Sequence, residues 1–121
     1  MTLKESGENY LEAILVLSKS GRSIRAIDIV NYFGYARPTV SVALKQLKAE
    51  GYVNVDDRNF ITLSPKGKRI ANSIYDKHES MAKILLSLGV DEKTAYKDAC
   101  RLEHVLSNKS FKAIKEHFNL K

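Results

Sequence analysis

The N-terminal half of the chain contains segments whose apolar residues recur at the spacing of an amphipathic helix. The first helix is predicted from about Glu5 to Ser20, and Gly21 ends it. A second is predicted over residues 24–33, with Ser23 as its N-cap and Gly34 as its terminator. Two helices joined by a short loop are therefore expected.

A tight turn at residues 34–35 separates these helices from a third. This helix is predicted to begin around Arg37, because Pro38 then lies in the first turn, where a missing backbone N–H is tolerated. Two short β-prone runs follow at residues 52–55 and 60–63, and the four residues between them are polar. This pattern is typical of a β-hairpin. Helix, helix, turn, helix and hairpin in this order predict a winged helix-turn-helix domain.

Only helices are predicted after the hairpin. Ser64 and Pro65 form a start signal for a long helix that reaches about Gly89. Asp91 is the predicted N-cap of the next helix, and a last helical segment follows a cap at Ser107 or Asn108. The predicted fold is therefore mainly α, with a winged helix-turn-helix domain over residues 1–64 and a helical region over residues 65–121.

Composition narrows the classes of protein that remain. The chain has 121 residues, 20 Lys and Arg against 14 Asp and Glu, a formal charge of +6 and a pI near 9.4. This excess favours a polyanionic partner. A single cysteine excludes an internal disulfide, and no apolar run is long enough to span a bilayer. We expect a cytoplasmic protein with no membrane partner.

The positive charge is concentrated where a winged helix meets DNA. Residues 37–69 contain seven basic and three acidic side chains. The third helix is the one that enters the major groove, and the hairpin and the next helix start can hold the phosphate backbone. The alternative is a protein-interaction module with a hydrated basic surface. The predicted contacts with double-stranded DNA are Arg37, Thr39, Ser41, Lys45, Arg58 and Lys66.

A second group of residues has the chemistry of a metal site. On a helix, Cys100, Glu103 and His104 lie side by side on the flank of the apolar face formed by Ala95, Ala99, Leu102 and Leu106. A thiolate, a carboxylate and an imidazole at this spacing can bind one divalent transition metal. His78 interrupts the apolar stripe of the long helix, and Glu12 lies in the most apolar run of the first. Each of these residues also has an ordinary interpretation as a packed or solvated side chain.

Four motifs together suggest a family. "ENYLEAIL", "RPTVSVALKQLKAEGYV", "ITLSPKGKRIA" and "DACRLEHVLS" resemble, in order and spacing, the DtxR/MntR family of metal-dependent transcriptional repressors, in its short form without an SH3-like domain. The resemblance implies a homodimer that binds a palindromic operator when Fe²⁺ or Mn²⁺ is bound. Its apolar contacts would come from the last two helices, through Val105, Phe111, Ile114 and Phe118. The implied metal ligands are Glu12, His78, Cys100, Glu103 and His104.

The chain departs from the family pattern at a few positions. Asn9 stands where members often carry Asp or Met, and it offers only a neutral carbonyl oxygen. Cys100 matches the iron-responsive branch, whereas Glu12 matches the manganese-responsive one. Ala82 and Tyr96 stand at two positions that supply an ancillary metal site in the iron branch, so the resemblance implies no such site here.

Two other functions compete with a metal-dependent repressor. One is a metal-independent winged-helix regulator in which Cys100 acts as a redox sensor, although the neighbouring Glu103 disfavours a thiolate. The other is an enzyme, for example a zinc hydrolase with Glu103 as base. The sequence has no HExxH motif, phosphate-binding Gly-rich loop or nucleophile elbow, so we expect no enzymatic activity and no small-molecule substrate.

Overall fold

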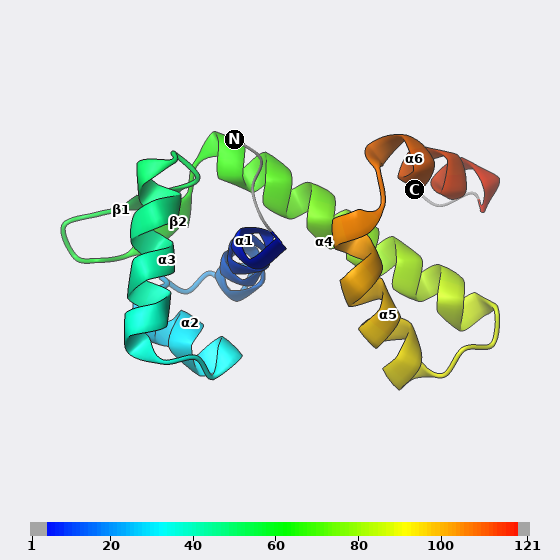
Figure 1. Ribbon diagram of the computed structural model, residues 1–121, viewed down its shortest axis with the longest axis horizontal. Helices are drawn as coiled ribbons and strands as arrows, with labels where there is room; N and C mark the ends of the chain where they lie inside the picture. Colours follow the sequence, from blue (N-terminus) through cyan, green and yellow to red (C-terminus); the bar gives the residue numbers. More distant parts are fainter. Residues whose placement is uncertain (1–4, 119–121) are drawn as a thin grey trace. The chain divides into compact units, whose positions relative to one another are not determined.

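The computed structural model describes residues 5–118, in which the chain forms six helices and one two-stranded sheet (Figure 1). The mainly α fold predicted from the sequence is confirmed. The ends of the two predicted domains, residues 1–4 and 119–121, lie outside the described residues. The elements are α1 Glu5–Ser18, α2 Ala26–Phe33, α3 Arg37–Ala49, β1 Val53–Val55, β2 Ile61–Leu63, α4 Pro65–Ser87, α5 Glu92–Val105 and α6 Asn108–His117.

The chain divides into two compact units, the first ending at Asn72 and the second beginning at Ser73. The boundary therefore lies within α4, whereas the boundary predicted after Ser64 coincides with the start of this helix. In the first unit, α1 contacts α2 and β2, and α3 contacts α2 and β1. The most deeply buried apolar side chains of this unit are Leu11, Ile14, Ile24, Ile29, Val40 and Val53.

The sheet has one more participant than the sequence predicts. β1 and β2 pair antiparallel, with Asn54 opposite Thr62. The backbone N–H of Ile61 also donates a 2.7 Å hydrogen bond to the carbonyl of Ile24, which forms an isolated bridge beside β2. Ile24 is 2% exposed, so it contributes to the core as part of the sheet rather than of a helix.

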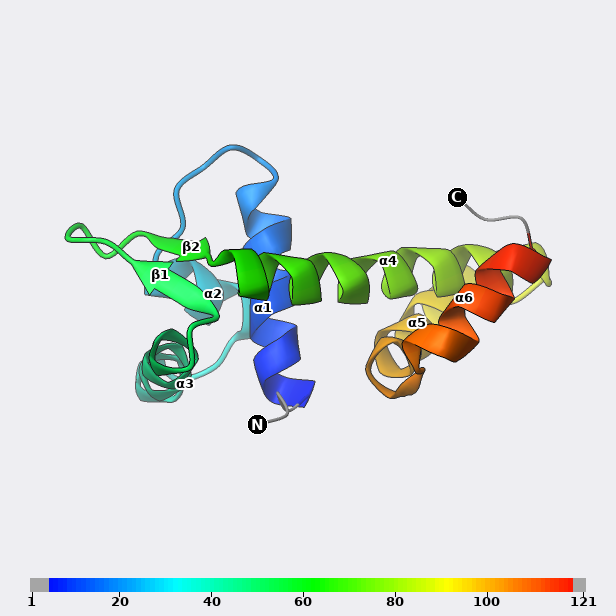
Figure 2. The same cartoon turned by 90° about the horizontal axis from the view of Figure 1, so that it is seen from above.

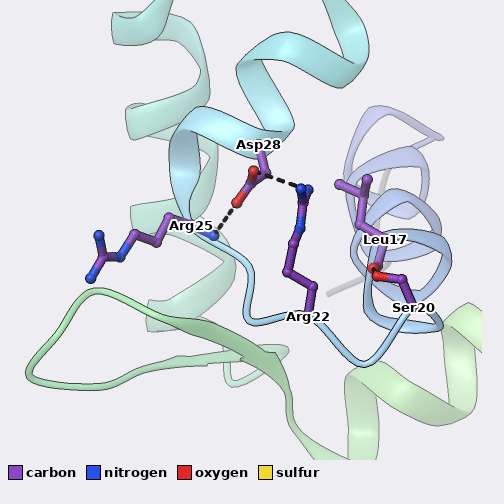
Figure 3. A network of polar contacts seen from close by, with 5 residues as sticks. All are labelled: Leu17, Ser20, Arg22, Arg25 and Asp28. Atoms are coloured by element: carbon purple, nitrogen blue, oxygen red, sulfur yellow. Dashed lines mark hydrogen bonds and ion pairs between the residues drawn. The ribbon is translucent and has the colours of Figure 1, made fainter.

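The predicted N-cap of the second helix is wrong for a local reason. The structure places the N-cap at Arg25 rather than Ser23, because the carboxylate of Asp28 accepts a 2.8 Å hydrogen bond from the backbone N–H of Arg25 (Figure 3). Arg22 also lies 3.2 Å from the other oxygen of Asp28. An acidic residue in the first turn thus sets the start of α2. The end of α1 at Ser18 is likewise two residues earlier than predicted.

Ser64 connects the hairpin to the start of α4. Its backbone N–H donates to the carbonyl of Tyr52 at 3.0 Å, and its hydroxyl accepts from the N–H of Gly67 at 3.0 Å. Its Oγ also lies 2.6 Å from the carbonyl oxygen of Gly51, to which it donates. Gly67 permits this close approach, because a Cβ there would lie 2.1 Å from the carbonyl oxygen of Tyr52.

The second unit contains α4 from Ser73 onwards together with α5 and α6, helices that Figures 1 and 2 label. Its core consists of Met81, Ala82, Ile84 and Ala99, with Leu102, Leu106 and Ile114 packed against it. Two polar contacts hold α6 and the turn before it to α4: Lys77 Nζ donates to the Leu106 carbonyl at 3.0 Å, and Lys115 Nζ lies 3.0 Å from an Asp76 oxygen.

The predicted caps of the last two helices are confirmed. Asp91 accepts from the Thr94 N–H at 2.9 Å, and Ser107 accepts from the Ser110 N–H at 3.1 Å. The hydrogen bond from the Thr94 backbone lowers the pKa of Asp91. None of the helices in the described part of the chain is long and apolar enough to cross a membrane.

We predict that Gly67→Ala destabilises the protein by about 1–3 kcal/mol, because the added methyl group would collide with backbone rather than with a movable side chain. Urea unfolding measures the change. Lys68→Ala, at the exposed neighbouring position, is the matched control and should stay within about 0.5 kcal/mol of wild type. Equal stability of Gly67→Ala and wild type would contradict the close packing of α4 on Tyr52.

Candidate nucleic-acid interface and metal centre

α3 buries one face and exposes the other. Val40, Leu44 and Leu47 form the buried face, and Pro38 in the first turn begins the helix as predicted. α3 contains no acidic residue, and both of its lysines are exposed. The exposed face therefore presents positive charge and short polar side chains to solvent. All six predicted DNA contacts are exposed in the structure: Arg37, Thr39, Ser41, Lys45, Arg58 and Lys66.

A groove of about 450 Å³ lies in the first unit between the start of α2, α3 and the hairpin. Its floor is apolar, whereas Arg25, Lys45 and Lys48 bring three cations to its walls. The side chain of Arg25 extends towards the hairpin (Figure 3). Its guanidinium lies 4.4 Å from the centre of the Phe60 ring. The groove is thus open, basic and adjacent to α3.

Arg25 is a candidate that sequence reasoning missed. The sequence places it inside the second helix, where its side chain has no defined neighbour. In the structure it is the residue before α2, and its exposed guanidinium reaches the hairpin. The signal that would have located it is Asp28, three residues further on, which is the acidic N3 partner of a capping arrangement.

The hairpin turn has a fixed backbone. Both Arg58 and Phe60 donate their backbone N–H to the carboxylate of Asp56 at 2.9 Å, and Asn59 adopts φ 66°. At the other end of the hairpin, Lys66 Nζ donates to the carbonyl of Glu50 at 3.2 Å and lies over the Tyr52 ring at 4.2 Å. Arg58 is therefore presented on an ordered turn, whereas the ammonium of Lys66 already has partners.

Glu103 is the most buried charged residue in the described part of the chain. It is 1% exposed, and it lies between two histidines of the same unit. His78 Nδ1 is 2.9 Å from one carboxylate oxygen, and His104 Nε2 is 3.2 Å from the other. Neither carboxylate oxygen accepts an aligned hydrogen bond from the described residues. A carboxylate in this position requires positive charge close to it.

The sequence placed Glu103 on the flank of the apolar face of its helix, and here the structure differs. Glu103 is as buried as Ala95 and Ala99 on the same helix. Cys100 lies on the exposed side of the same helix, one turn earlier. The imidazole of His104 is 2% exposed. The candidate donors of this unit are thus the buried carboxylate of Glu103, the imidazoles of His78 and His104, which contact it, and the thiol of Cys100.

Two further candidate residues, Glu12 and Asn9, belong to the first unit. Glu12 is half-buried on α1, in the first unit. Asn9 lines a cavity of about 360 Å³ in that unit, together with Tyr10, Phe33 and Tyr35. Burial, and to a smaller extent Tyr35, raises the pKa of Tyr10. The third histidine, His117, is exposed.

Ala82 and Tyr96, which stand at the two ancillary-site positions of the iron branch, both lie in the second unit. Ala82 is completely buried in its core. The ring of Tyr96 lies 5.8 Å from the ring of His78 and is tilted by 44°. Neither side chain carries the carboxylate or imidazole that a second ion would need.

The donor set fits a divalent transition metal. Glu103 supplies buried anionic oxygen, and His78 and His104 supply imidazole nitrogen at contact distance from it. A cation beside these residues would compensate the buried carboxylate, and manganese, iron and zinc all accept such ligands.

Comparison with known proteins gives matches over almost the entire chain. The model of the "Iron dependent repressor, N-terminal DNA binding domain" matches residues 2–59, and that of the "Iron dependent repressor, metal binding and dimerisation domain" matches residues 64–119. An uncharacterised HTH-type transcriptional regulator of Methanocaldococcus jannaschii is 36% identical over 115 residues, which cover 93% of this chain and 92% of the relative.

Two further proteins are similar to this chain over most of its length. The transcriptional regulator MntR of Salmonella typhimurium is 29% identical, over 91% of this chain and 70% of its own length. The solved structure of the manganese regulator SloR is similar with a TM-score of 0.83 at 28% identity, over 100% of this chain and 56% of that chain. This chain therefore spans about half the length of SloR.

We predict that the effect of Glu103→Gln on stability depends on metal. Without metal, the variant should be at least as stable as wild type, because it removes a buried charge and keeps the shape. With free Mn²⁺ at about 100 times its Kd, wild type should gain about 2.7 kcal/mol, and the variant should lose most of this gain. Thermal unfolding with and without Mn²⁺ measures both effects.

The matched control for this prediction is His117→Ala, which changes a histidine exposed on α6. It should show the full stabilisation by Mn²⁺. A large loss of stability in metal-free Glu103→Gln would instead indicate a structural ion-pair cluster with protonated histidines.

Proposed function

The chain belongs to the iron-dependent repressor family, and we propose on this basis that it represses transcription as a homodimer that binds operator DNA when Fe²⁺ or Mn²⁺ is bound. The observation that carries the proposal is the buried Glu103 between His78 and His104. This cluster lies inside the segment that matches the metal binding and dimerisation domain.

We propose Glu12, His78, Cys100, Glu103 and His104 as the metal ligands. The contacts of Glu103 with both histidines support three of them. Glu12 and Cys100 are proposed from the sequence resemblance. When bound, the ion supplies the positive charge that lets a buried carboxylate and two neutral imidazoles share one site. The named relatives MntR and SloR support manganese as strongly as the family description supports iron.

The exposed basic surface of the first unit supports the DNA contacts. Arg37, Thr39, Ser41 and Lys45 lie on α3, which would enter the major groove. Arg58 and Lys66, together with Arg25, would contact phosphates on either side of that helix. No catalytic role is proposed for any of these residues, because the family is one of transcriptional regulators.

The apolar surface for a second copy is smaller than the sequence suggested. Phe111 is only 7% exposed, because it packs within the second unit, and Ile114 is half-buried. Val105 is 76% exposed and Phe118 41% exposed. We propose that these two residues, with the exposed Leu86 and Leu88 at the end of α4, contribute to the dimer interface.

The rival interpretation of Cys100 as a redox sensor is not supported by the comparisons. The segment that contains it matches a metal binding domain. Its exposed position on α5 is compatible with contact to an ion at the edge of the Glu103 cluster.

We predict that Mn²⁺ or Fe²⁺ is required for tight binding to DNA from the promoter region of the protein's own gene. His104→Ala should abolish tight binding even when either ion is present. A switch from mostly incompetent to mostly competent dimer needs about 5.5 kcal/mol of differential metal binding. Anaerobic fluorescence anisotropy with and without each ion measures the response. Equal binding by wild type under all conditions would overturn the metal switch, and a response to peroxide alone would favour the thiol sensor.

We also predict a steep salt dependence. With about 6–10 phosphate contacts per dimer, affinity should fall roughly 10³- to 10⁵-fold between about 50 and 200 mM salt. Arg58→Ala should make the slope of log affinity against log salt shallower by about 1 for each subunit that loses a contact. Lys93→Ala, an exposed cation on α5, is the control and should leave the slope unchanged. A flat salt response in wild type would contradict binding along the phosphate backbone.

A further inference from the structure

The exposed face of α3 carries one large apolar side chain. Val42 is 66% exposed, more than any other large apolar residue in the described part of the first unit. It lies about 160–200° around the helix from Val40 and Leu44, which are buried. Pro38, Lys45 and Ala49 share its stripe, because they lie at i−4, i+3 and i+7 from it, and all are exposed.

An aliphatic side chain here is informative because its surroundings are basic and polar. Arg37, Lys45 and Lys48 are exposed on the same helix, and α3 has no acidic residue. This charge selects a polyanion as the occupant of the face. Val42 also lines the cavity that Tyr10, Phe33 and Tyr35 share, and the charge of the helix favours a nucleic acid rather than a protein on this face.

Val42 also lies where a reading helix contacts bases. It is the sixth residue of α3, and the N-terminal part of such a helix meets base edges in the major groove. Its side chain has no hydrogen-bond donor or acceptor. The only apolar group that an unmodified base pair displays in the major groove is the C5 methyl of thymine.

We propose that Val42 determines operator specificity by packing against the C5 methyl group of a thymine at one fixed position in each half-site. The inference rests on the proposed function, since it requires that α3 lies in the major groove. The short side chains of Thr39 and Ser41 and the cation Lys45 surround the contact. Loss of one buried methyl contact corresponds to about four-fold in affinity per half-site, or about 0.8 kcal/mol.

The test is a cycle that removes each partner of the contact separately. Duplexes of random sequence are selected with wild-type protein and Mn²⁺, and each thymine of the selected site is then replaced by deoxyuridine, which lacks only the methyl group. Binding of wild type and Val42→Ala to both sets of DNA is measured by anisotropy. The exposed position of Val42 means that the variant should fold normally, and its thermal midpoint checks this.

Wild type should lose about four-fold in affinity per half-site at one thymine position, and Val42→Ala should bind the two DNAs equally. Lys45→Ala is the matched control on the same stripe. It should weaken binding to both DNAs and keep the full sensitivity to the methyl group. Val42→Thr should keep part of the sensitivity to the thymine methyl group, because threonine retains one methyl group of the valine side chain.

Two results would overturn the inference alone. They are equal binding of wild type to thymine and deoxyuridine DNA, and unchanged methyl sensitivity in Val42→Ala. Failure of wild type to select any duplex, in contrast, would overturn the proposed function itself, and the inference with it.

Discussion

The second unit depends on how the charge of Glu103 is compensated. A carboxylate with 1% exposure has lost its hydration, and a nearby positive charge or a proton must replace it. His78, from α4, and His104, from α5, contact its two oxygens, so the polar cluster lies where these two helices pack together. Small side chains next to it, Ala82 and Ala99, allow the helices to approach. A divalent ion at this point would therefore stabilise the packing of the unit as well as occupy a site, which is the coupling that a metal-dependent regulator needs.

The first unit is held together by buried apolar side chains and by the hydrogen bonds of Ser64. α3 is held by Val40, Leu44 and Leu47, whereas the hairpin is fixed to the start of α4 through the hydrogen bonds of Ser64. Because these contacts use only the inner face of α3, its outer face is left for a partner. The open groove beside it adds Arg25, the residue before α2, to the cations of α3, and the guanidinium of Arg25 reaches the hairpin.

Charge and apolar contact have different consequences on this surface. Exposed cations such as Arg58 attract any phosphate backbone, so they set affinity and its dependence on salt rather than the sequence that is bound. Val42 cannot attract a phosphate, and an exposed aliphatic side chain on a nucleic-acid-binding helix can distinguish bases only through their methyl groups. Specificity and affinity would then reside in different residues of one helix, and each can be altered without the other.

The sequence by itself determined the helices, the hairpin and most of their ends, because apolar periodicity, Pro38 and the caps at Asp91 and Ser107 act locally. It also identified Cys100, Glu103 and His104 as neighbours on one helix. It did not show that Ile24 joins the sheet, that Asp28 sets the start of α2, or that Phe111 is covered, since each depends on a contact with another part of the chain. Only the tertiary structure decided that Glu103 is buried between two histidines, because burial is a property of the packed helices and not of the spacing along one of them.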